Sequence, residues 1–334
     1  MKFRMQNHWR WLVALGAVFV PAVVSGAIEL PFTFKSGGAI KASEVNANFA
    51  ALAAKLDGLS GVAVSAPVGT FTLAGVVTDA PIRKFSQTID AAWSPGSTLG
   101  KPQLSPIVIE RDSGEGSPVL EHTLSLGKQL ATASIVLGNL TIELTKVNVM
   151  GVSVATPRGA QAQEAISLSC TSITYKWAEP NKPALSMTYD VTQNVGGSAA
   201  TQAFTYGYFP AGVTPDAAYV PLSNFAHQIA TPSVGAKPQF GALSIVKAVG
   251  PDTLDSLGLL LSGTGGSTVD VDFFADASTI KNGVQLDGVV VTGVALSTDT
   301  SGALSEKTSF GYQTINWTAG NVSQGWDVIA NKSL

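Results

Sequence analysis

Two stretches of this chain repeat the same pattern of residues, and this repeat constrains the fold more than any other feature. EAISLSCTSITYKW spans residues 164–177, and EKTSFGYQTINW spans residues 306–317. Placing Glu164 on Glu306 also aligns Tyr175 with Trp317. In both stretches side chains alternate between two faces, and β-branched and aromatic residues are frequent. This pattern predicts one strand in each stretch.

The repeat continues upstream of both stretches. KPQL begins at Lys101 and KPQF begins at Lys237, and each is followed by a short apolar run, a Gly/Pro/Asp break and a Leu-rich segment. Next come residues 140–155 and 284–297, each of which predicts a strand pair that ends in a Val-x-Gly-Val turn. Because three blocks recur in the same order, the sequence predicts a tandem duplication.

Composition favours two mainly β domains. The chain has 334 residues, of which 45% are hydrophobic and 13% are charged, so it can bury two cores of ordinary size. The formal net charge is −3 and no basic stripe is present, which argues against a nucleic-acid partner. Cys170 is the single cysteine, so no intramolecular disulfide can form, and we expect a small core residue rather than a catalytic thiol.

The N-terminus has the pattern of a signal peptide over residues 1–27. Lys2, Arg4 and Arg10 form a basic region, and the apolar run over 11–24 is short for a membrane span. We expect cleavage after Ala27, with Gly26 as the alternative site. The chain is then expected to be secreted or periplasmic in a bacterium, without stable membrane insertion, although a retained anchor is the alternative.

Residues 28–61 predict an extended segment followed by a helix. Ser43 is a suitable N-cap, and apolar residues then recur at steps of three and four. This spacing is typical of a trimeric oligomerisation helix, but packing of the helix on its own domain is an equal alternative. The predicted oligomerisation residues are Val45, Phe49, Leu52, Leu56 and Leu59.

The remaining chain divides into two predicted mainly β repeats with one short helix each. The first repeat is expected over 62–180 and the second over 204–320, with a linker at 181–203 and a tail at 321–334. Residues 185–194 of the linker alternate, so a continuation strand there is an open alternative. The helices are expected at 118–126 and 251–261. The expected strands of the first repeat are 71–77, 85–93, 104–110, 133–137, 140–155 and 165–177.

No group of residues predicts an active site. Asp270 and Asp272 share one face of a predicted strand and could bind a cation, but alternation with inward Val269, Val271 and Phe273 explains them better. The histidines lack metal-ligand spacing. The sequence therefore predicts no catalytic, cofactor or metal residue and no enzyme. Four aromatic residues are expected to serve in strand packing rather than in a sugar platform: Tyr206, Tyr208, Phe209 and Tyr219.

The order of these elements resembles the Hcp family, the tube-forming proteins of type VI secretion systems, which are akin to phage tail-tube proteins. Four segments carry the resemblance in the first repeat: 85–93, 100–102, 124–128 and 164–177. The second repeat is less similar, because Gly263-Thr264 stands where the first repeat has Gly127-Lys128. Together the repeats cover roughly two thirds of the chain.

The resemblance implies two tandem Hcp-like β-barrels and assembly into rings. Family rings have six subunits, so three chains with two repeats each would make a pseudo-hexameric ring or tube, and the expected partner is the chain itself as a homotrimer. Family tube proteins lack an export signal, so a role in type VI secretion is left open and a cell-surface or secretion-apparatus partner is a further expectation. The alternative function is a secreted binding module or adhesin that presents barrel loops to a glycan or a cell-surface partner.

Overall fold

The computed structural model describes residues 66–334 except 157–160, 198–202, 232, 234, 235, 267 and 300. The predicted signal peptide, the segment 28–61 and its oligomerisation residues therefore lie outside the described residues. The described chain belongs to one compact unit, Val64–Leu334, and is mainly β, with 55% strand and 8% helix. This confirms the expected fold class, but no closed barrel is detected among the described residues.

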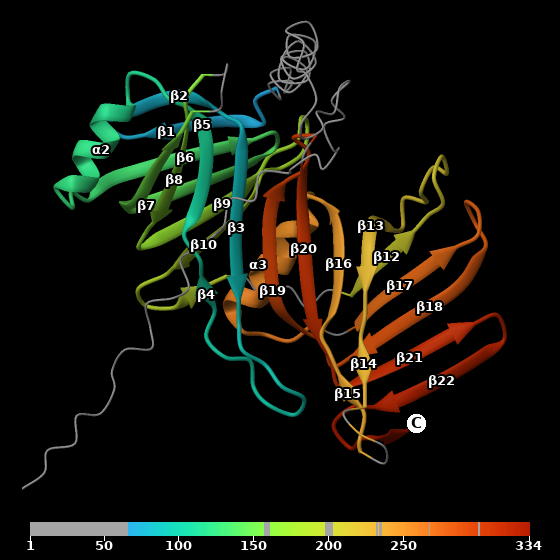
Figure 1. Cartoon of the computed structure of the whole chain (residues 1–334). Helices are drawn as coiled ribbons and strands as arrows, with labels where there is room; N and C mark the ends of the chain where they lie inside the picture. The colour runs from blue at the N-terminus through green and yellow to red at the C-terminus, as the bar shows by residue number, and fades with distance from the viewer. Residues whose placement is uncertain are drawn as a thin grey trace, which may run out of the picture. The chain divides into compact units, whose positions relative to one another are not determined.

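The described residues of the first half, which we define as residues 66–197, form one helix and a set of strands that mostly follow the predicted ranges (Figure 1). The helix is α2 (Ser117–Ser125). The strands are β1 (Gly69–Leu73), β2 (Val77–Ile82), β3 (Lys84–Asp90), β4 (Gln103–Leu104), β5 (Ile107–Asp112), β6 (Leu130–Leu137), β7 (Leu140–Ala155), β8 (Gln163–Ser169), β9 (Ser172–Trp177), β10 (Leu185–Asp190) and β11 (Val195–Gly196).

The second half, which we define as residues 203–334, has a similar order of elements. Its helix is α3 (Asp252–Ser262). Its strands are β12 (Phe204–Tyr208), β13 (Val220–Ala226), β14 (Ile229–Ala230), β15 (Gln239–Phe240), β16 (Leu243–Ala248), β17 (Thr268–Phe274), β18 (Ile280–Asp287), β19 (Val290–Thr298), β20 (Leu304–Gly311), β21 (Thr314–Ala319), β22 (Val322–Asp327) and β23 (Lys332–Ser333).

One antiparallel sheet runs through both halves, and we call it the shared sheet. Its strand order is β7 (residues 148–155), β8, β5, β3, β19, β20, β16 and β13. Each half adds an outer sheet. The first outer sheet contains β2, β1, β6, β7 (residues 140–147), β9, β10 and β11. The second outer sheet contains β12, β17, β18, β21, β22 and β23.

The strand pairings of the first half recur in the second half. β5 pairs with β8 as β16 pairs with β20, and β6 pairs with β7 as β17 pairs with β18. β7 pairs with β9 as β18 pairs with β21. The first strands differ, because β1 is antiparallel to β6 whereas β12 is parallel to β17.

The predicted Val-x-Gly-Val turns are wrong. Residues 149–152 and 291–294 lie inside β7 and β19, and each strand has a β-bulge there, between Val149 and Gly151 or between Val291 and Gly293. A glycine in a strand interior is typical of such a bulge. The chain instead passes from the outer sheet to the shared sheet five residues earlier, where Lys146 inside β7 and the equivalent Gly288 between β18 and β19 take positive φ values of 51° and 61°.

The single strand predicted over 165–177 is also wrong. β8 ends at Ser169 and β9 begins at Ser172, because the chain crosses here from the shared sheet to the first outer sheet. The buried residues change parity at this corner: Ile166 and Leu168 are buried before it, and Ile173 and Tyr175 after it. This change of parity breaks the alternation that one continuous strand requires, so the sequence contains a signal for the corner.

Three further ranges differ from the predictions. The predicted linker at 181–203 contains β10, in the alternating residues where a continuation strand is left open, and β10 extends the first outer sheet by pairing with β9 along its length. The predicted tail at 321–334 contains β22, which pairs with β21 from Ala319↔Val322 to Thr314↔Asp327. The strand predicted over 71–77 is wrong, because β1 ends at Leu73, a turn occupies residues 74–76 and β2 begins at Val77. β2 is not predicted as a separate strand, because its sequence, VTDAPI, has little apolar content.

Candidate functional site

The two halves of the chain meet through an edge-to-edge strand pairing. β19 of the second half pairs antiparallel with β3 of the first half, from Gly293↔Asp90 to Ser297↔Ser86. The backbone N–H of Ala91 donates to the carbonyl of Thr292 at 2.8 Å, and the backbone N–H of Phe85 donates to the hydroxyl of Thr298 at 3.0 Å. Backbone pairing of this kind joins two sheets into one continuous sheet.

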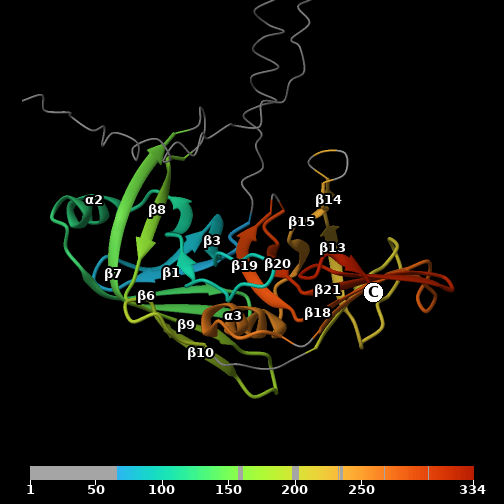
Figure 2. The same cartoon turned by 90° about the horizontal axis from the view of Figure 1, so that it is seen from below.

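The helix of the second half adds a second contact to this junction. α3 packs against β19 of its own half and against β9, β10 and β11 of the first half, and Figure 2 shows it lying beside β9 and β10. Its leucines are therefore buried on all sides, including Leu257, Leu259 and Leu260. The approach is close at Gly197, where an added Cβ would lie 3.0 Å from the carbonyl oxygen of Gly258.

The first half carries the counterpart of the β19 edge, but no strand covers it in the described chain. Residues 148–155 of β7 are equivalent to β19, and they pair only with β8 among the described residues. Val154 is 50% exposed and Met150 is exposed as well. No charged residue occurs between Val147 and Ala155. Natural edge strands are usually protected by charges, proline or bulges. The bulge at Gly151 does not by itself protect this edge, because β19 has the equivalent bulge at Gly293 and still pairs with β3.

The second half carries the counterpart of the β3 edge. β13 and β14 occupy this position, and residues 222–226 pair with β16 and with no second strand in the described chain. His227, Gln228 and the exposed Ile229 follow without a formal charge at neutral pH. Applying the β3–β19 register to these edges would place Val152 opposite Ile229, as Val294 lies opposite Ile89 within the chain.

The outer face of α2 is the counterpart of the α3 surface that packs against the first half. Leu120 and Thr123 are buried against the first half, but Val119 and Leu126 are 43% and 63% exposed. α3 has its corresponding face covered by the first outer sheet. The chain thus contains one complete junction, between its own halves. It also carries the two surfaces of a second such junction: the β7 edge with α2 in the first half, and the β13–β14 edge in the second half. Both surfaces are uncovered within the described residues.

A buried ion pair fixes the shared sheet in each half. Arg111 lies directly opposite Glu164 on the neighbouring strand, with Nη2 2.6 Å from Oε1. Lys247 lies directly opposite Glu306, with Nζ 2.6 Å from Oε2. All four side chains are buried. Glu164 and Glu306, which begin the two repeated stretches, are therefore each the buried partner of a basic residue on the neighbouring strand. The sequence patterns described above do not predict these ion pairs.

The pair in the second half belongs to a larger network at the start of α3. Nζ of Lys247 also lies 2.8 Å from Oδ2 of Asp252, and the Thr253 hydroxyl donates to Oε2 of Glu306 at 2.5 Å. The Thr308 hydroxyl donates to the other oxygen of Glu306. Burial alone would raise the pKa of Glu306, but the adjacent Lys247 ammonium holds that pKa below its ordinary value.

The residues considered for cation or sugar binding are arranged for packing. Val269 and Val271 are buried as expected, whereas Phe273 is only partly buried. Asp272 accepts a hydrogen bond from the Tyr219 hydroxyl at 3.0 Å. Tyr219 packs edge-on against Phe274, with ring centroids 4.9 Å apart.

The other three aromatic residues of that set do not form one exposed platform. Tyr206 is fully buried, and Phe209 stacks on Phe274 at 4.3 Å. Tyr208 is exposed. Among the described residues no group of three or more His, Cys, Asp or Glu side chains could hold a metal ion.

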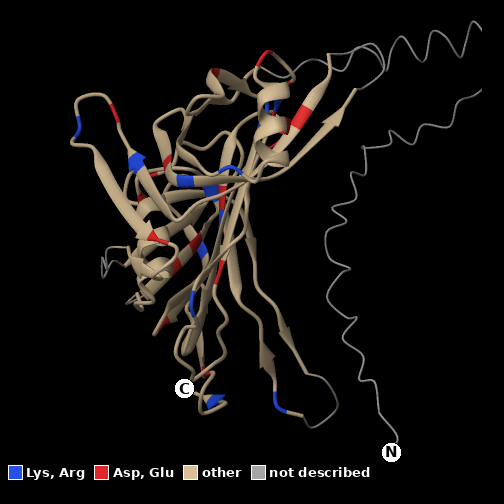
Figure 3. Ribbon diagram, turned by 90° about the vertical axis from the view of Figure 1, so that its left-hand side faces the viewer, with Lys and Arg blue, Asp and Glu red and all other residues tan. Residues whose placement is uncertain are grey.

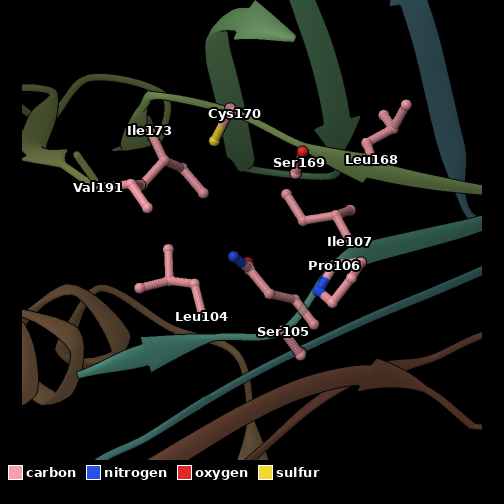
Figure 4. Close-up of a pocket in the computed structure, with 10 residues that line it drawn as sticks. Leu104, Ser105, Pro106, Ile107, Leu168, Ser169, Cys170, Ile173 and Val191 are labelled. Carbon is pink, nitrogen blue, oxygen red and sulfur yellow. The ribbon is translucent and has the colours of Figure 1, made fainter. Parts of the chain in front are cut away.

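Cys170 lies at the corner between β8 and β9, beside a small cavity in the first half. Figure 4 shows Cys170, Ile173 and Val191 on one side of this cavity and Leu104 on the other. Its volume is about 80 Å³. Burial raises the pKa of the Cys170 thiol to about 11, so the thiolate is a minor species at neutral pH.

The charged side chains do not mark a binding face. Lys and Arg residues are interspersed with Asp and Glu residues over the described chain (Figure 3). No helix of the described residues is long and apolar enough to cross a membrane.

Comparisons with known proteins give a partial likeness. No protein-family model matches this chain, and no curated protein matches it. A type VI secretion system effector from Yersinia pestis is 24% identical, with a TM-score of 0.31, covering 37% of this chain and 99% of the effector. Hcp1 from Salmonella typhimurium is 15% identical, with a TM-score of 0.34, covering 39% of this chain and 99% of its own. The secreted protein Hcp3 from Pseudomonas aeruginosa is 13% identical, with a TM-score of 0.24, covering 31% of this chain and 96% of its own. At TM-scores below 0.5 these likenesses do not establish a family.

Proposed function

We propose that this chain is an exported structural protein that assembles head to tail with copies of itself. In this arrangement β13 and β14 of one chain pair with residues 148–155 of β7 in the next. The β21–β22 sheet of the first chain then covers α2 of the next chain. One observation carries the proposal: the chain already makes this junction once, between its own halves.

Head-to-tail contacts of this kind close into a ring or continue as a filament. The resemblance of the sequence to the Hcp family favours a closed ring of six halves, that is, three chains. It also favours a role related to type VI secretion tubes. A tandem duplication is consistent with three chains, because two fused copies in each chain would halve the number of chains that a six-membered ring needs.

The predicted oligomerisation helix would reinforce the trimer. Val45, Phe49, Leu52, Leu56 and Leu59 are spaced for a three-stranded coiled coil, which would add to the sheet contacts. Fewer than three heptads are marginal as an isolated coiled coil. Leu52→Asp is therefore expected to weaken the trimer without abolishing it.

Native mass spectrometry of the purified chain at micromolar concentration tests the proposal. We expect the mass of three chains. Val154→Lys places a charge in the free edge of β7 and is expected to yield monomers with unchanged far-UV circular dichroism. Val136→Lys is the matched control, because Val136 is 37% exposed on β6, which has a partner strand on each side. A wild-type protein that is only monomeric would refute the proposal.

A further inference from the structure

A groove of about 390 Å³ lies where the end of β3 meets the second half. Asp90 and Trp93 line it from the first half, and Phe240, Thr292 and Ser309 line it from the second half. The pairing of β3 with β19 brings these residues together, because Asp90 lies directly opposite Gly293. The volume falls within the range of small-molecule sites.

Trp93 forms one wall of the groove and is supported by a glycine. A Cβ added to Gly311 would lie 2.5, 2.5 and 2.7 Å from three neighbouring atoms of the indole, Cδ2, Cε3 and Cζ3. Such similar distances to adjacent ring atoms mean that Gly311 lies under the face of the ring, not at its edge. One face of Trp93 is therefore held against β20, and this half-buried side chain lines the groove.

Phe240 forms the other aromatic wall and has its own support. Its ring stacks with Trp326 at 6.1 Å and an interplanar angle of 28°, and with Trp317 at 6.5 Å and 29°. Stacked aromatic side chains lose little conformational freedom when a ligand binds, since their orientation is already fixed by packing. The groove thus has two supported rings, one from each half.

Among the described residues that line the groove, only Asp90 is charged. Asp90 is exposed, and its carboxylate has no ion-pair or hydrogen-bond partner among the described residues. The Thr292 hydroxyl donates to the carbonyl of Ser309 at 3.2 Å, which leaves its oxygen free to accept. None of the residues that line the groove is Lys, Arg or His. The faces of both rings also carry negative electrostatic potential.

We propose that this groove binds a small organic cation with an alkylated ammonium group. Aromatic faces attract such cations, most strongly when a tryptophan is present. The Asp90 carboxylate supplies the opposite charge, and the hydroxyl oxygen of Thr292 accepts a hydrogen bond from a polar substituent of the ligand. All residues of this site belong to one chain, so its ligand binding can be measured separately from the assembly proposed above.

Isothermal titration of the purified chain with choline tests this site. The neutral control is 3,3-dimethylbutan-1-ol, which has the same shape without the charge. We expect saturable choline binding and at least about tenfold weaker binding of the alcohol, from the strength of cation–π and ion-pair contacts. Asp90→Asn and Trp93→Ala are each expected to weaken choline binding about tenfold. Trp93→Phe is expected to retain most of it, and Glu121→Gln, on the exposed face of α2, is expected to change nothing.

Three results would overturn the proposal. The first is the absence of saturable choline binding to the folded wild-type protein. The second is equal binding of choline and the neutral alcohol, which would make the groove a general apolar site. The third is tighter binding of methyl glucoside than of choline, which would make it a sugar site.

Discussion

Removing the Lys247 ammonium should strongly destabilise the second half. At 2.6 Å, Lys247 and Glu306 attract each other by about 6 kcal/mol at an effective dielectric constant of 20, before desolvation is subtracted. Lys247→Met leaves Glu306 fully buried, with two hydroxyl donors but no cation among its described partners, and Asp252 nearby. Breaking one partner of a buried pair typically costs about 3–5 kcal/mol, and we expect a loss in that range at pH 7.

Urea unfolding followed by tryptophan fluorescence at several pH values measures this loss. In the wild type the pKa of Glu306 is lowered, so its contribution to stability is present above the unfolded pKa of about 4.3 and is lost as the pH falls through the folded value. Without Lys247, burial should instead raise this pKa, and acid should relieve the penalty. The difference between wild type and variant should therefore shrink from pH 7 to pH 4.

The double variant Lys247→Met/Glu306→Leu separates a lost ion pair from lost packing. Replacing both partners by apolar groups is expected to recover most of the stability, because the fully buried Glu306 charge is gone and only the partly exposed Asp252 carboxylate loses its cation. A single-variant loss below about 1 kcal/mol, or a loss that does not change with pH, would refute this reasoning.

Three further predictions follow from individual contacts. His227 shares a 2.7 Å hydrogen bond with the Tyr312 hydroxyl, and burial lowers the pKa of His227. The free energy of unfolding should therefore fall as the pH drops below about 6.5, the pKa of an unfolded histidine. His227→Gln should remove this pH dependence in urea melts. Gly311→Val should cost about 1–3 kcal/mol by displacing the Trp93 indole, and Trp93→Ala should suppress this cost in thermal melts. Iodoacetamide should label Cys170 about a hundredfold more slowly in the folded than in the urea-unfolded protein at pH 8, and equal rates would contradict its buried environment.

The sequence predicts those parts of the fold that depend on local patterns. Both helices occur within one residue of their predicted bounds, because Leu-rich periodicity and flanking Gly and Pro mark them. The corner at Cys170 was missed because each side of it alternates correctly on its own. Alternation over residues 185–194 leaves β10 open as a continuation strand, whereas β22 is not predicted, because its strand character depends on pairing with β21, which a local pattern does not contain.

The candidate site could be predicted only in part. Arg111 and Lys247 occupy equivalent positions when the two KPQ motifs are aligned, as Glu164 and Glu306 do in the later part of the repeat. Lys247 stands in an apolar run, whereas Arg111 lies between Glu110 and Asp112. This signal was available and indicates a buried pair in each half. The uncovered edges could not be predicted, because whether a strand lies at the edge of a sheet depends on the spatial order of all the strands.

The most direct test of head-to-tail assembly is a disulfide across the proposed junction. In a Cys170→Ser background, Val152→Cys and Ile229→Cys should be directly opposite on neighbouring chains, at the 4.5–5.5 Å Cα separation of antiparallel pairs, which permits a disulfide. Mild oxidation should then give reducible dimers and trimers on denaturing gels, while neither single-cysteine variant should extend beyond a dimer. Only monomer bands after oxidation, or equal cross-linking when Val136→Cys replaces Val152→Cys, would contradict assembly through these two edges.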